Sequence, residues 1–186
     1  MTKASLSSDL LAVAASVSAE PALVQTLADG GQPVAARQGI VRDLFADKVS
    51  AQAIDALCDV VAKRWSGSAA LVEAIETLGA QSAFANAGSS LDTIEDEIFA
   101  FGRLVDSSAE LQMALTDPSA SPAAVESLVR SLLGDKVDAT ALSVLAYFAS
   151  HLRGRRVDAV IDHLSQLAAA QNGKAVAEVR SVVELS

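Results

Sequence analysis

The chain contains the hexapeptide Leu44-Phe45-Ala46-Asp47-Lys48-Val49 and, further on, a second version of it, Leu132-Leu133-Gly134-Asp135-Lys136-Val137. Lys48 and Lys136 are 88 residues apart, and many other residues recur at this offset. The matched pairs include Leu23 and Leu111, Leu27 and Leu115, Asp29 and Asp117, Val41 and Val129, Arg42 and Arg130, Leu10 and Ile98, and Val17 and Val105. Spacing that is kept over most of the chain indicates that one structural unit occurs twice in tandem.

Apolar residues at spacings of three and four, separated by Pro, Gly and capping residues, predict a succession of helices in both units. The predicted helices of the first unit span 5–18, 20–28, 33–46, 49–65 and 68–87, and those of the second span 90–106, 109–116, 122–133, 138–151 and 156–171. The helix at 68–87 can close the first bundle and open the second. We therefore predict an all-α fold of two duplicated helical bundle units that share a central helix.

The end of the chain departs from this helical pattern. The tail, 173–186, is rich in valine with partial alternation, which favours a short strand.

Composition excludes several classes of function. The net charge is -9, so a nucleic acid is not expected as a partner. Every apolar stretch is interrupted before the roughly 18 uncharged residues that a spanning helix needs, so direct membrane insertion is not expected. The single cysteine, Cys58, falls among apolar helical positions, which is typical of a buried structural thiol.

The residues for catalysis are few. The two histidines, His151 and His163, fall on different predicted helices, and the sequence contains no glycine-rich phosphate loop or paired-cysteine spacing. We expect neither an enzyme nor a bound metal or cofactor.

Basic residues occupy matching places near the ends of two helices, as Lys63-Arg64-Trp65 and as Arg153-Gly154-Arg155-Arg156. Cations interact favourably with a helix C-terminus, and this is the simpler interpretation. The alternative is contact with a partner, because Trp beside Arg is typical of interface hot spots. Trp65 and Arg155 are therefore candidate partner-binding residues.

Several segments resemble the delta subunit of F-type ATP synthase (oligomycin-sensitivity-conferring protein family) in its actinobacterial form. They are Glu95-Asp96-Glu97-Ile98-Phe99-Ala100-Phe101-Gly102-Arg103-Leu104-Val105, Ala114-Leu115-Thr116-Asp117-Pro118, Gly154-Arg155-Arg156 and the tail from Gly173 to Ser186. The resemblance implies that 68–172 is the family's six-helix domain and that 1–67 is an added partial duplicate. It also implies that the family's C-terminal domain would begin where this chain ends, as in a truncated form or the delta part of a fused b-delta subunit.

The resemblance further implies a non-catalytic stator connector, peripheral on the cytoplasmic face of the cell membrane. Such a subunit binds N-terminal helices of alpha subunits and links the catalytic head to the b subunit or b segment of the peripheral stalk, mainly through the missing domain. The alpha-binding groove of the family lies between the first and fifth helices of the bundle. Carried onto this chain, the expected contacts are Leu71, Ile75, Leu78, Leu142, Ala146 and Tyr147.

Two alternatives stay open. Each of those six residues, and Leu142 especially, could instead belong to an ordinary core, and periodicity does not say which face is exposed. An all-helical ligand-binding or regulatory scaffold unrelated to ATP synthase would have the same helical pattern.

Overall fold

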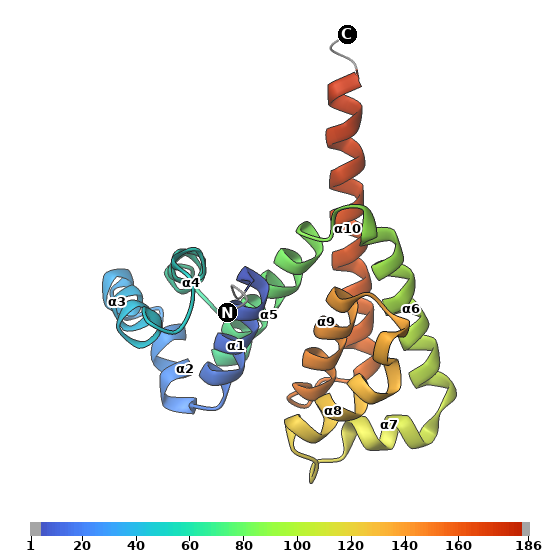
Figure 1. Ribbon diagram of the computed structural model, residues 1–186. Coiled ribbons are helices and arrows are strands. Elements are labelled where there is room, and N and C mark those ends of the chain that lie inside the picture. The colour runs from blue at the N-terminus through green and yellow to red at the C-terminus, as the bar shows by residue number, and fades with distance from the viewer. Residues whose placement is uncertain (1–4, 184–186) are drawn as a thin grey trace. The chain divides into compact units, whose positions relative to one another are not determined.

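The computed structural model describes residues 5–183, and the regular structure in that range is helical throughout (Figure 1). The predicted all-α fold is confirmed. The chain divides into two compact units, Met1–Ser82 and Ala83–Ser186.

The first unit contains α1 (Leu6–Ser18), α2 (Pro21–Ala28), α3 (Val34–Phe45), α4 (Ala51–Ala62) and most of α5 (Ser68–Ala85). Helix α4 contacts both α1 and α3. The apolar side chains expected at helical spacing form its core, and the most completely buried include Leu10, Val13, Val17, Leu27, Val41, Leu57 and Val61.

The second unit contains a 3-10 turn, η1 (Gly88–Ser90), followed by α6 (Leu91–Ser107), α7 (Ala109–Thr116) and α8 (Pro122–Leu133). A second 3-10 turn, η2 (Gly134–Lys136), leads into α9 (Ala139–Ser150) and α10 (Val157–Val183). Helix α8 packs against α9, and α6 packs against α10 (Figure 1). The core includes Ile94, Ile98, Phe101, Val129, Leu145, Phe148 and Leu164.

The helix bounds repeat at the offset that the sequence showed. Adding 88 to the first and last residue of α2, α3 and α4 gives the bounds of α7, α8 and α9. The turns repeat as well, because Asp29 accepts a hydrogen bond from the amide of Gly31 and Asp117 accepts one from Ser119, both at 2.8 Å. The duplication therefore extends from the sequence to local backbone structure.

A long-range contact is also duplicated. In the first unit, Asp9 Oδ2 on α1 accepts a hydrogen bond from the amide of Ser50, the N-cap residue of α4. In the second unit, Glu97 on α6 accepts one from the amide of Asp138, the N-cap residue of α9. Each contact joins residues that are 41 positions apart in the chain. A carboxylate from the longer helix thus holds the start of the facing helix in both units.

The division between the units falls within α5, after Ser82, whereas the sequence placed it before residue 68. The close approach of α1 to α5 explains why most of α5 belongs to the first unit. A Cβ atom at Gly79 would lie 2.8 Å from Leu11 Cδ2, so the two helices meet where α5 has no side chain.

The predicted strand at 173–186 is wrong over the described residues, because α10 continues to Val183. Val176, Val179 and Val183 are spaced by three and four residues, which fits a helix as well as alternation fits a strand. The intervening Ala175, Ala177, Glu178 and Arg180 favour a helix. Residues 184–186 of the predicted tail lie outside the described range.

Within residues 5–183, no single helix combines the length and the apolar character that crossing a bilayer requires. Helices α1 and α2 meet those criteria only as a pair, and they are bent by 109° relative to each other.

Candidate partner-binding surfaces

The residues predicted to bind a partner differ in their exposure. Leu71 and Ile75 on α5 and Ala146 on α9 are almost fully buried. The other five are partly exposed, namely Trp65, Leu78, Leu142, Tyr147 and Arg155. Only this second group presents side-chain surface that a partner could contact without a rearrangement.

Trp65 and Leu78 line one open groove in the first unit. The groove lies between α4 and α5 and has a volume of about 620 Å³. Its apolar lining consists of Ala56, Val60, Trp65, Ala70, Ala74 and Leu78, and its polar lining consists of Asp59, Lys63, Glu73, Thr77 and Gln81. The structure therefore brings together two residues that the sequence singled out for different reasons.

The geometry of Trp65 follows from the end of α4. The helix ends at Ala62, before the predicted end at residue 65, so Trp65 lies in the connection to α5. Its indole Nε1 donates a hydrogen bond to the carbonyl oxygen of Val60 at 2.9 Å. Arg37, which is buried, donates another to the carbonyl oxygen of Lys63 at 3.1 Å. These two bonds satisfy carbonyl groups at the helix end, and the first holds the indole ring where it lines the groove.

Sequence reasoning missed most of this groove. The signal was present on α5, where Ala70, Ala74 and Leu78 recur at intervals of four and therefore share one face of the helix. Small residues at such positions do not separate an exposed face from a buried one, so the groove required the tertiary structure.

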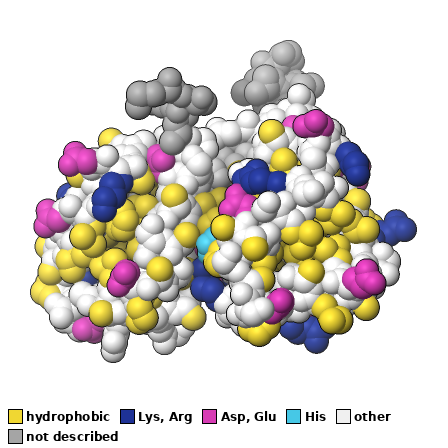
Figure 2. Space-filling model, turned by 60° about the horizontal axis from the view of Figure 1, so that its bottom comes forward, with side chains coloured by type: hydrophobic (Ala, Val, Ile, Leu, Met, Phe, Trp, Pro, Cys, Tyr) yellow, Lys and Arg dark blue, Asp and Glu magenta, His cyan; other side chains and the backbone are white. Residues whose placement is uncertain are grey.

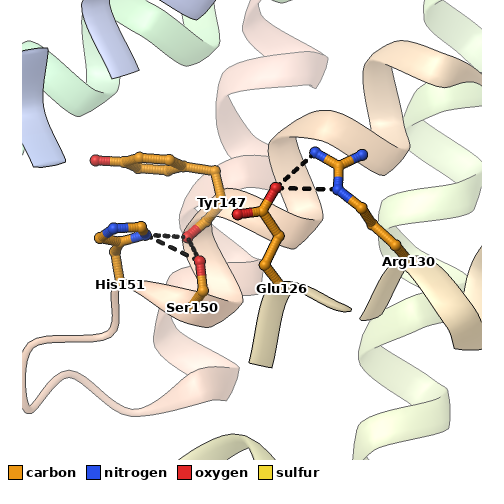
Figure 3. A network of polar contacts seen from close by, with 5 residues as sticks. All are labelled: Glu126, Arg130, Tyr147, Ser150 and His151. Carbon is orange, nitrogen blue, oxygen red and sulfur yellow. Dashed lines mark hydrogen bonds and ion pairs between the residues drawn. The ribbon is translucent and has the colours of Figure 1, made fainter. Parts of the chain in front are cut away.

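In the second unit, a polar network surrounds the end of α9 (Figure 3). The Tyr147 ring stacks on the imidazole of His151, with ring centroids 4.3 Å apart. Ser150 Oγ donates a hydrogen bond to the carbonyl oxygen of Tyr147, and His151 Nδ1 lies 2.9 Å from the same oxygen. His151 Nδ1 also lies 2.9 Å from Ser150 Oγ, so the three groups form one closed set of polar contacts.

Beside this network, Arg130 and Glu126 on α8 form an exposed ion pair at 2.7 Å (Figure 3). An exposed pair of this kind contributes little to stability. It does place one charge of each sign on the surface of α8.

Arg155 also acts at the end of α9. Its Nη2 donates to the carbonyl oxygen of His151 at 2.9 Å, and its Nε donates to that of Leu152 at 3.0 Å. These contacts support the helix C-terminus interpretation of the basic segment. They also hold the backbone turn at Arg153 and Gly154, where φ is positive at both residues.

The charged surface is mixed in sign. On the face drawn in Figure 2, acidic and basic side chains are interspersed around exposed apolar ones. This face has no concentrated basic patch of the kind that nucleic-acid binding requires.

Comparison with known proteins identifies the chain's relatives. The family model described as ATP synthase delta (OSCP) subunit matches residues 79–186. Three similar relatives, each named ATP synthase subunit delta, come from Streptomyces. That of Streptomyces avermitilis is 38% identical over 97% of this chain and 67% of its own length, and that of Streptomyces griseus is 36% identical over 98% and 68%. That of Streptomyces coelicolor is 37% identical over 98% of this chain and 67% of its own length.

The matched segment covers more than half of the chain, and the similarity to the relatives extends through the first unit as well. The chain belongs to the ATP synthase delta (OSCP) subunit family.

Proposed function

We propose that this protein is a non-catalytic stator connector of an F-type ATP synthase. It binds N-terminal helices of alpha subunits and links the catalytic head to the peripheral-stalk b subunit or b segment. It acts at the periphery of the cell membrane, on the cytoplasmic face. Membership of the delta (OSCP) family carries this proposal, because the matched segment contains the helices of the second unit.

The exposure of α9 supports a role in helix binding. Leu142 and Tyr147 are partly exposed on a helix whose other large apolar residues, Val144, Leu145 and Phe148, are buried. An amphipathic partner helix requires exposed apolar anchors on a rigid element. We propose Leu142 and Tyr147 on α9 among the alpha contacts. Of the other predicted contacts, Ala146 is buried on the same helix, and Leu71 and Ile75 are buried in the first unit.

A peptide of the alpha-subunit N-terminus from the same organism tests the proposal. Titration into the full chain should shift the NMR signals of Tyr147, the only tyrosine, in a saturable manner. Leu142→Ala should weaken binding by about tenfold, because truncating an apolar anchor costs about 1.4 kcal/mol or more. Ser143→Ala, at the neighbouring exposed position, should leave binding unchanged.

A folded chain that shows no saturable binding to the peptide would rule out the alpha-binding role. Circular dichroism of each variant separates a loss of binding from a loss of structure.

A further inference from the structure

We propose that the α4–α5 groove of the first unit binds an amphipathic helix of another protein, with basic residues on both sides of its apolar stripe. This site goes beyond the proposed alpha contacts of α9. It gives the duplicated unit a binding function of its own.

The floor of the groove has the spacing that a helix needs. Ala56 and Val60 recur at an interval of four on α4, and Ala70, Ala74 and Leu78 do so on α5. The lining on α5 extends from Ala70 to Gln81, which corresponds to roughly 16 Å, or about three turns of helix. Alanine side chains on both walls let a partner helix approach the backbone closely.

Trp65 supplies an aromatic anchor at one part of the groove. Its only polar atom, Nε1, is already bonded to the Val60 carbonyl, so the ring offers apolar surface to an occupant. A small-molecule site usually has several polar groups that converge on a ligand. Here the charged groups, Asp59, Lys63 and Glu73, are exposed side chains, as expected at the rim of a helix-binding groove.

Charge complementarity selects the partner. Asp59 projects from α4 and Glu73 from α5, so each wall of the groove carries an exposed carboxylate. The chain as a whole has a net charge of -9, which attracts cationic segments. A partner helix with lysine or arginine on both flanks matches the two walls, and an acidic residue near Lys63 sets its direction. Such exposed pairs contribute to specificity and association rate.

The experiment uses two synthetic peptides of about 18 residues with the same Leu/Ala stripe. One peptide has lysine on both flanks and the other has glutamate. The full chain is titrated with each, and the fluorescence of Trp65, the only tryptophan, reports binding. We expect a saturable change with the lysine peptide, at least tenfold weaker binding of the glutamate peptide, and weaker binding of the lysine peptide at high salt.

Three variants locate the site. Ala74→Gln should weaken binding of the lysine peptide by at least tenfold, because a longer polar side chain fills the floor of the groove. Ala12→Gln on α1, at an exposed position outside the groove, should have no effect. Glu73→Lys, at an exposed position that tolerates the change, should reduce the preference for the lysine peptide by at least fivefold.

Several results would overturn the proposal. They are the absence of a saturable Trp65 response with the lysine peptide, equal binding of both peptides, and unchanged binding by Glu73→Lys. A change in Trp65 fluorescence on dilution of the protein alone would show that a second copy of the chain occupies the groove. That result would also refute the proposal.

Discussion

Removal of the Asp9 carboxylate should destabilise the first unit, and removal of Glu97 should do the same to the second. Asp9 is 6% exposed, and its Oδ2 accepts the Ser50 amide proton at 2.9 Å. Asp9→Ala leaves that part-buried amide without its acceptor, at a cost of about 1–3 kcal/mol. Glu97 is more exposed and accepts from Asp138 at 3.0 and 2.9 Å through its two oxygens. We expect the free energy of unfolding to fall by about 2 kcal/mol in Asp9→Ala and by about 1.5 kcal/mol in Glu97→Ala.

The chain carries a spectroscopic probe in each unit, which makes the assay specific. Trp65, the only tryptophan, reports on the first unit, and Tyr147, the only tyrosine, reports on the second. In urea, a loss of 2 kcal/mol lowers the transition midpoint by about 1 M when the m-value is near 2 kcal/mol/M. Asp9→Ala should move the midpoint seen by Trp65, and Glu97→Ala should move the midpoint seen by Tyr147.

Two controls decide whether the hydrogen bond is the cause. Asp9→Asn keeps an acceptor but removes the charge, so it should cost about half as much as Asp9→Ala. Asp96→Ala changes an exposed acid beside Glu97 and should stay within about 0.5 kcal/mol of the wild type. If Asp9→Ala and Glu97→Ala are no more destabilising than Asp96→Ala, the carboxylates do not hold the helix starts and the reasoning is wrong.

Three further predictions follow from other parts of the structure. Gly79→Ala should lower the free energy of unfolding by about 1 kcal/mol, because the clash with Leu11 exceeds the gain in helix propensity. Gly39→Ala on α3 should raise it by about 0.5–1 kcal/mol, because no atom lies within 4 Å of the new Cβ. Urea titration of both variants checks the sign of each change. Burial raises the pKa of the Cys58 thiol, so alkylation at pH 8 should be much slower in the native protein than in urea, and equal rates would contradict its burial. The hydroxyl and amide of Ser119 lower the pKa of Asp117 by hydrogen bonding. This carboxyl therefore stabilises the fold above its unfolded-state pKa, and that stabilisation is lost as the pH falls through the folded-state pKa. Ser119→Ala should raise the pKa of Asp117 in an NMR titration, and an unchanged pKa would contradict the contact.

The arrangement of helices was largely predictable because its causes are local. Ser121 and Pro122 begin α8 as expected, with the Ser121 hydroxyl accepting the amide proton of Ala124. The offset of Lys48 and Lys136 predicted helix bounds that repeat in both units. The error was the tail, where Val176 and Val179 fit a helix and a strand alike, and the continuity of α10 was not visible in a short window.

The sequence alone determined the all-α fold and the duplication, because helix periodicity, capping residues and repeat spacing can be read along the chain. The family followed from the resemblance of segments such as 95–105 to delta subunits. Tertiary structure decided which apolar faces are covered. In the structure Leu71 and Ile75 are buried, whereas Leu78 is partly exposed and lines the same groove as Trp65. Yet these three residues follow one another on α5 at intervals of four and three, which puts them on one face of the helix. It also brought Asp9 to Ser50 across 41 residues. Periodicity marks an apolar stripe, but exposure depends on which distant element packs against it.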